Sequence, residues 1–204
     1  MRTNDVAPTA ALRAALDALA AQDPARLPAS SIRRDLRELL TATNRLHAEL
    51  VRRVAAFDAT GSSGDDGYRS TRAWLRVFGR LSHAGATRLV RAARLLDRLP
   101  RLADAAAGGA VSAEHVHRVD RLAERVGLEA VLPVEAALTE FASWVDPTVL
   151  SRACARVRRG VDEEATRPDA MITPEDIPTP PEDAPAKDSP SHGEGLAERD
   201  RLGW

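Results

Sequence analysis

Apolar side chains recur every three, four or seven residues from Ile32 to Phe57, which is the spacing of one face of an α-helix. The stripe consists of Ile32, Leu36, Leu39, Leu46, Leu50, Val54 and Phe57. Ser30 or Ser31 precedes it as a candidate helix cap, and the pattern lasts to Asp58. The pattern predicts one long amphipathic helix near the beginning of the chain.

Shorter amphipathic segments follow, and each begins after a residue that caps helices well. These residues are Ser70, Ser82, Ser112 and Asp146, and a further helix is expected over 133–144. The residues expected to face the core are Ala73, Trp74, Val77, Phe78, Leu81, Leu89, Ala92, Leu96, Leu99, Val116, Val119, Ala123, Val126, Val134, Leu138, Phe141, Leu150, Cys154, Val157 and Val161. Because Trp74 and Phe78 are large, we expect them to anchor their helix in the core.

No segment alternates with the two-residue period of a strand. The pattern therefore predicts an all-α fold, a multi-helix bundle with one long N-terminal helix and several short amphipathic helices. We divide the chain into an N-terminal extension with a weak helix (1–29), a helical domain (30–165) and a disordered, acidic, proline-rich C-terminal tail (166–204). The tail is expected because seven of the 13 prolines lie between Pro168 and Pro190, among Glu, Asp, Ser and Thr.

Composition adds two constraints to this picture. Aromatic residues make up 3% of the 204 residues, so the core must be aliphatic. Residues 30–160 carry 22 basic and 15 acidic side chains, net +7, whereas residues 161–204 carry 4 and 12, net −8. A basic body with an acidic tail indicates an anionic partner for the body or a tail that shields it, although unrelated solvated charges explain the same distribution.

We expect the protein to be cytoplasmic and to have no membrane partner. Cys154 is the single cysteine, which excludes an internal disulfide framework and a cysteine-ligated zinc finger and fits a reducing compartment. Arg13 and Asp17 interrupt what would be the apolar core of a signal peptide. No apolar run in the sequence is long enough to cross a bilayer.

Three segments of the helical domain resemble a known family. They are Gly67–Leu75 (GYRSTRAWL), Leu81–Arg94 (LSHAGATRLVRAAR) and Gly109–Val116 (GAVSAEHV). In this order they resemble domain of unknown function 222, also called the 13E12 repeat family, over residues 30–165. The resemblance implies an α-helical domain that is commonly fused to a downstream HNH endonuclease and whose own biochemical role is unassigned.

The nuclease part of that family pattern is not expected in this chain. An HNH centre needs histidines and an Asn or Asp around a divalent metal. After residue 165 the sequence contains one histidine, His192, and no paired cysteines. We therefore expect either a stand-alone version of the domain or a truncated remnant of a longer reading frame.

Seven arginines form the candidate nucleic-acid-binding site. They are Arg69, Arg72, Arg76, Arg80, Arg88, Arg91 and Arg94. The first four fall within an arc of about 80° on a helix, and guanidinium groups bind phosphates through charge-assisted hydrogen bonds. The alternative is compositional, because 28 of the 29 basic residues are arginine and any solvated helix face would then carry arginines.

No metal site, cofactor or catalytic residue is predicted. His115 and His117 are two residues apart and point in nearly opposite directions on a helix, so they do not chelate one ion. We expect the first to take part in capping near Ser112, and we interpret Cys154 as a small core residue.

Together these features predict a non-catalytic helical accessory domain that binds DNA or positions an HNH nuclease on it. The alternative is a protein-interaction or oligomerisation module, in which the apolar stripe from Leu36 to Phe57 pairs with a partner helix.

Overall fold

The computed structural model describes residues 7–166, and within this range every regular element is a helix and no strand occurs. The helices are α1 (Pro8–Ala20), α2 (Ala29–Thr60), α3 (Thr71–Phe78), α4 (His83–Arg98), α5 (Pro100–Gly108), α6 (Ala113–Val126), α7 (Leu128–Val131), α8 (Glu135–Ala142) and α9 (Pro147–Thr166), with 3-10 turns at Pro24–Arg26 and Leu132–Val134. The all-α fold is confirmed. The expected disordered tail lies almost wholly outside the described residues.

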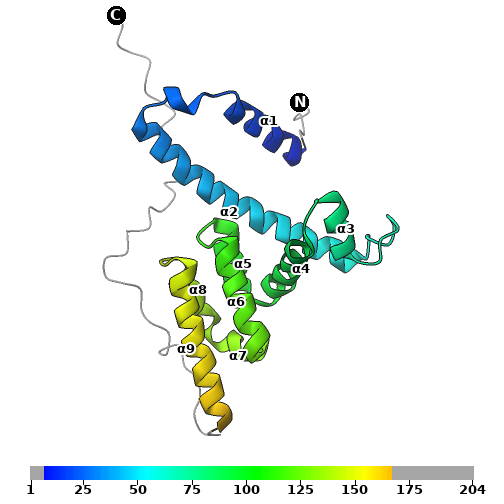
Figure 1. Ribbon diagram of the computed structural model, residues 1–204, viewed down its shortest axis with the longest axis vertical. Coiled ribbons are helices and arrows are strands. Elements are labelled where there is room, and N and C mark those ends of the chain that lie inside the picture. Colours follow the sequence, from blue (N-terminus) through cyan, green and yellow to red (C-terminus); the bar gives the residue numbers. More distant parts are fainter. Residues whose placement is uncertain (1–6, 167–204) are drawn as a thin grey trace, which may run out of the picture.

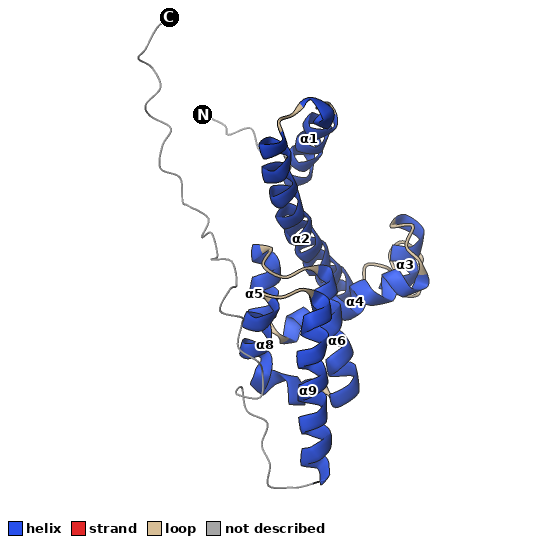
Figure 2. Ribbon diagram, turned by 60° about the vertical axis from the view of Figure 1, so that its left-hand side comes forward, coloured by secondary structure: helices blue, strands red, loops and turns tan. Residues whose placement is uncertain are grey.

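The helices α4 to α9 form a bundle, and the C-terminal half of α2 lies across it (Figure 1). Within the bundle α4 is central, because it packs against α2, α3, α5 and α6, and α6 and α9 run side by side. The N-terminal half of α2 extends beyond the bundle, with α1 folded back alongside it and α3 near the other end of α2 (Figure 2). Among the described residues, no helix combines the length and the apolar character needed to cross a membrane.

Four of the described helices, α3, α4, α6 and α9, begin at the predicted caps. The Ser70 hydroxyl accepts a hydrogen bond from the backbone N–H of Ala73 at 3.3 Å, and the Ser82 hydroxyl accepts one from Gly85 at 3.0 Å. The Asp146 carboxylate accepts from two N–H groups in the first turn of α9. The cap predicted for the long helix was wrong, because α2 begins at Ala29 after Pro28 and no side chain caps it.

The core is aliphatic, as the composition predicts. Its most deeply buried side chains include Leu99, Leu102, Leu138 and Leu150, and Phe141 is the one aromatic residue among the buried described residues. The helix expected over 133–144 instead begins as α7 at residue 128, and a 3-10 turn separates α7 from α8. Local spacing did not reveal this break because the apolar pattern continues through it.

A buried carboxylate joins α8 to α5. Glu135 is 8% exposed, and its Oε1 accepts hydrogen bonds from the backbone N–H groups of Arg101 at 2.7 Å and Leu102 at 3.1 Å. Since α5 has Pro100 at its first position and no side-chain cap of its own, Glu135 supplies the acceptor from a distant helix.

The apolar stripe of α2 is only partly in the core. The buried residues of α2 are Ala48, Val51 and Val54, whereas Leu36 and Leu40 are 55% and 66% exposed. The bundle covers only the C-terminal half of α2, and it covers the flank that carries the smaller side chains. Most of the predicted leucine row therefore faces solvent.

The turn after α5 comes very close to α2. Gly109 has a φ of 83°, and a Cβ added there would lie 2.8 Å from Cγ2 of Thr41 and 3.0 Å from its carbonyl oxygen. Asn44 of α2 donates a hydrogen bond to the carbonyl oxygen of Gly109 at 3.2 Å. This position thus requires glycine both for its backbone conformation and for the close approach.

Gly109→Ala should lower the free energy of unfolding by about 2–4 kcal/mol, because it adds a steric clash to the cost of the left-handed backbone. The matched control is Gly61→Ala, whose φ is 69° and whose Cβ would meet no atom within 4 Å. It should cost only about 1–2 kcal/mol. Urea denaturation measures the free energy of unfolding of both variants. Equal losses of stability would contradict the close approach of the turn after α5 to α2.

Candidate nucleic-acid interface

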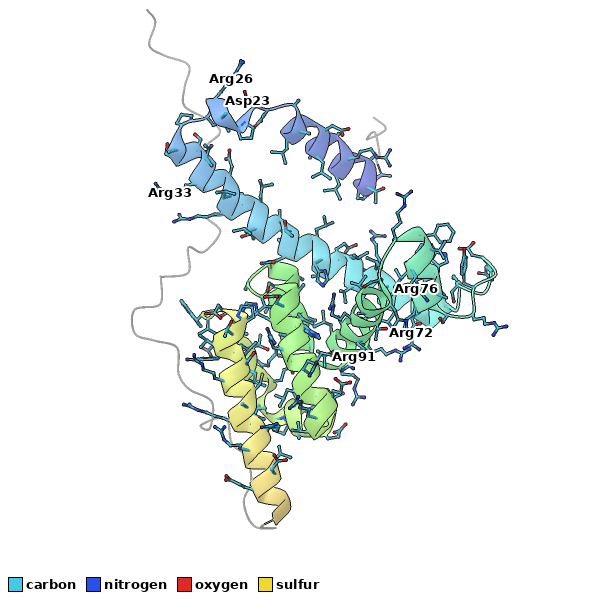
Figure 3. The ribbon with its side chains drawn as sticks, viewed as in Figure 1. Asp23, Arg26, Arg33, Arg72, Arg76 and Arg91 are labelled. Atoms are coloured by element: carbon cyan, nitrogen blue, oxygen red, sulfur yellow. The ribbon has the colours of Figure 1, made fainter. Side chains whose placement is uncertain are left out.

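Four of the predicted arginines lie on and around α3. Because α3 spans only Thr71–Phe78, Arg72 and Arg76 lie one turn apart on it, while Arg69 precedes the helix and Arg80 follows it. All four side chains are exposed, and none forms an ion pair with another described residue. Figure 3 shows Arg72 and Arg76 at the end of the molecule that α3 forms.

The backbone of Arg80 is strained. Its φ is 50°, and it is the one non-glycine residue with a positive φ in the described part of the chain. The left-handed conformation costs an L-residue about 1–2 kcal/mol, and such strain concentrates at functional sites. The strained residue lies between α3 and α4, within the predicted binding surface.

Four aromatic side chains gather beside these arginines. The ring centroid of Trp74 lies 4.8 Å from that of Phe57 and 4.6 Å from that of Phe78, and the rings of Tyr68 and Phe78 are 5.7 Å apart. Phe78 is 58% exposed, so the cluster reaches the surface. Most of the few aromatic residues of this protein are thus at the edge of the fold.

The expected core face of α3 was wrong for Val77 and Phe78, whereas Trp74 packs against the core as expected. Thr71 and Leu75 are the buried residues of α3, while Val77 is 55% exposed and Trp74 is only half-buried. The apolar spacing of this short helix is compatible with two neighbouring faces. The helix packs on α4 and α2 through the Leu75 face, and Phe78 is left outside.

The glycine-rich loop before α3 is held in place by hydrogen bonds at both ends. The indole N–H of Trp74 donates to Oδ2 of Asp66 at 2.6 Å, and the hydroxyl of Thr71 donates to Oδ1 of Asp58 at 2.7 Å. Arg94 donates to the other oxygen of Asp58 at 3.0 Å. Two hydrogen bonds lower the pKa of the Asp58 carboxyl. The bond from the Thr71 hydroxyl has the larger effect, and the bond from Arg94 has the smaller one.

The predicted contact Arg91 has a structural role. Its Nε donates to Oδ2 of Asp120 at 2.9 Å and its Nη1 donates to Glu124, which joins α4 to α6. Asp120 is 8% exposed. The contact with Glu124, and then that with Asp120, raises the pKa of Arg91 and keeps it charged. Because Arg94 likewise pairs with Asp58, two of the seven predicted contacts are neutralised within the protein.

Arg88, the last of the seven, is exposed on α4 beside α6. Together with His47, His117 and Asp120 it lines a pocket of about 490 Å³. Burial lowers the pKa of His117; Asp120 opposes this effect, and the positive charge of Arg88 adds to it. Arg88 thus contributes to a positive potential over α6.

A second group of arginines was not predicted from the sequence. Arg118, Arg121 and Arg125 of α6 and Arg158 of α9 line a groove of about 300 Å³ between the two helices. The spacing of the first three indicates a shared helix face, a signal that the sequence contains. That Arg158 lies opposite them depends on how α9 packs on α6.

His115 and Cys154 take part in the fold. His115 completes a capping box with Ser112, and its Nε2 lies 2.8 Å from the carbonyl oxygen of Val145. Cys154 is buried, as predicted, and burial raises the pKa of its thiol to about 11. No group of three or more His, Cys, Asp or Glu side chains able to hold a metal occurs within the described residues.

Arg91→Ala should lower the free energy of unfolding by about 2 kcal/mol, because it leaves the buried carboxylate of Asp120 without its cation, in a site that is partly open to water. Arg94→Ala is the matched control, since its side chain is 72% exposed, and it should cost less than about 1 kcal/mol. Urea denaturation measures both. If the two variants lose the same stability, Arg91 is not the tie between α4 and α6.

Comparison with known proteins extends the resemblance beyond the three motifs. No curated protein and no solved structure matches the chain. A family model matches residues 33–176, which is more than half of the chain and includes all three motifs. The chain therefore belongs to the family described as domain of unknown function (DUF222).

Proposed function

We propose that this domain is a non-catalytic accessory module that binds DNA through Arg69, Arg72, Arg76, Arg80 and Arg88. The observation that carries the proposal is that these five side chains are exposed and have no ion pair among the described residues. Other arginines of α4 are instead neutralised by carboxylates. The unpaired guanidinium groups supply the charge that attracts a polyanion.

The surface around α3 offers two kinds of contact to DNA. Guanidinium groups donate paired hydrogen bonds to phosphate oxygens and position a protein without reading the sequence. The exposed ring of Phe78 and the half-buried ring of Tyr68 lie among these arginines and are suited to stacking on unpaired bases. Sequence-tolerant, salt-sensitive binding is the behaviour that this combination favours.

The family resemblance extends the proposal to a partner. A domain that contacts the DNA backbone would hold an HNH nuclease at its substrate, and the cleavage chemistry would belong to the nuclease. The buried thiol of Cys154 fits a reducing compartment, so the cytoplasm is the proposed location.

Reversing three charges tests the proposed surface. Arg69→Glu, Arg72→Glu and Arg76→Glu combined in the full chain should weaken binding of a fluorescein-labelled DNA duplex at least about a hundredfold at low salt. The slope of log Kd against log salt should fall by about 3, because each lost phosphate contact removes about one unit. Fluorescence anisotropy across a salt series measures both quantities.

The matched control has the same change of net charge at another place. Arg33→Glu, Arg34→Glu and Arg37→Glu alter exposed residues of the projecting half of α2. This variant should keep most of the affinity and the salt slope. Equal weakening in the two variants, or no binding by the unaltered chain at low salt, would overturn the proposal.

Exposed leucines favour self-association as a second candidate function. Eight leucines of α1 and α2 are among the exposed large apolar residues: Leu12, Leu16, Leu19, Leu36, Leu39, Leu40, Leu46 and Leu50. No residue of α1 is buried, although a helix of 13 residues is marginal by itself in water. In a dimer with two-fold symmetry, the exposed leucines of α1 and α2 in one copy would pack against the same leucines of the other copy.

Leu36→Asp combined with Leu40→Asp should raise the dimer dissociation constant more than about a hundredfold, because each buried leucine contributes about 1.5–3 kcal/mol. Sedimentation velocity of the full chain over a range of concentrations measures the change. Val77→Asp on α3 is the control, since Val77 is equally exposed but lies outside the leucine rows. A wild-type chain that sediments as a monomer at every concentration would contradict this candidate function.

A further inference from the structure

The groove between α6 and α9 is a second basic surface. Four guanidinium groups line it, from Arg118, Arg121, Arg125 and Arg158, together with the imidazole of His117. No carboxylate lines it. The volume of about 300 Å³ is at the lower end of the range of small-molecule sites.

The charges of the groove are poorly compensated by the protein. On α6 the carboxylates of Asp120 and Glu124 point to α4, where Arg91 binds both. Oε2 of Glu124 also lies 4.0 Å from Nε of Arg121, a long and exposed ion pair. Arg118 and Arg125 form no ion pair with any described residue. Four like charges around one small groove repel one another unless an anion neutralises them.

One donor in the groove has no acceptor. The Nε atom of Arg158 is buried from solvent and forms no hydrogen bond with the described part of the protein. A buried donor without a partner costs about 1–3 kcal/mol, so native structures rarely keep one unless a ligand or ion satisfies it. Part of the Arg158 guanidinium is thus desolvated, next to a groove that Arg158 lines.

Small and apolar side chains line the groove beside these charges. Leu122 and Ala155 form part of it, and Cys154 adds a thiol whose pKa burial raises to about 11, so that the thiol stays neutral. An anion held there is attracted by the arginines and also contacts these less polar side chains. Charge-assisted hydrogen bonds are stronger under these conditions than in open solvent.

From these observations we infer that the α6–α9 groove is a binding site for a phosphate group, with Arg121 and Arg158 donating to its oxygens from opposite sides. A phosphate suits the groove better than a single carboxylate, because it brings up to two negative charges and more acceptor oxygens to four guanidinium groups. The phosphate comes either from a small compound such as a nucleotide or from a nucleic-acid backbone. The inference does not rest on the α3 surface.

Calorimetric titration of the full chain with inorganic pyrophosphate tests the site. The unaltered chain should bind one pyrophosphate per protein in a saturable manner. Arg121→Gln combined with Arg158→Gln should weaken this binding about tenfold or more, since it removes two charge-assisted contacts. Arg152→Gln combined with Arg156→Gln is the matched control on the exposed outer face of α9 and should bind nearly as the unaltered chain does.

Further arms of the experiment separate the two phosphate sources and the two surfaces. Displacement of pyrophosphate by an unlabelled oligonucleotide would identify the backbone as the source, and failure to displace it would identify a small phosphate compound. The Arg69, Arg72 and Arg76 charge-reversal variant should bind pyrophosphate normally, so failure of the α3 proposal does not decide this one. The inference is wrong if the unaltered chain shows no saturable binding, if the groove and control variants lose affinity equally, or if only an acidic peptide of residues 168–190 binds.

A second readout covers the case in which the groove variant does not fold. Cys154 is the single cysteine of the chain and lines the groove, so its reaction with a thiol reagent reports occupancy in the unaltered protein. Saturating pyrophosphate should slow labelling severalfold at a pH high enough for thiolate to form, whereas chloride at matched ionic strength should not. Equal labelling rates with and without pyrophosphate would overturn the inference.

Discussion

The ion pairs of Arg91 determine how charge is distributed over this domain. Arg91 reaches from the central helix α4 to α6 and binds Asp120 and Glu124 there. It thereby joins two helices of the bundle and neutralises two carboxylates of α6. The arginines on the neighbouring flank of α6 are left facing α9 without a carboxylate among the groove-lining residues. One partly buried interaction thus stabilises the fold and leaves an adjacent surface basic.

This division separates arginines that composition alone does not distinguish. In an arginine-rich chain, every solvated helix face carries guanidinium groups, and their number says little about binding. The structure distinguishes those paired with carboxylates, such as Arg91 and Arg94, from those without a partner among the described residues. Among the arginines without a carboxylate partner, one group lies around α3, and Arg118, Arg125 and Arg158 line the α6–α9 groove. Arg88 lies beside α6 between these groups, and its charge affects His117 at the edge of the groove.

The long helix α2 has two halves in different surroundings. Its C-terminal half is held by α4 and α5 through small side chains, and Gly109 allows the backbone after α5 to approach it closely. Its N-terminal half extends from the bundle and presents leucines to solvent beside α1. A helix that is anchored at one end can present an apolar face without losing its fold, because the anchored half supplies the stabilising burial.

The sequence by itself determined the all-helical character of the fold, four of the helix caps and the aliphatic character of the core. These features depend on residues within about one helical turn of each other, as at Ser70, Ser82 and Asp146. The sequence also indicated the basic helix faces, and the family through three short motifs.

Only the tertiary structure decided which flank of each apolar stripe is covered and which arginines are paired. Leu75 is buried in place of Phe78, Arg91 pairs with a residue 29 positions further along the chain, and Arg158 of α9 faces the arginines of α6. Helical spacing identifies a face, but its neighbours come from helices that are distant in sequence. Their packing therefore sets the burial, the pairing and the charge of each surface.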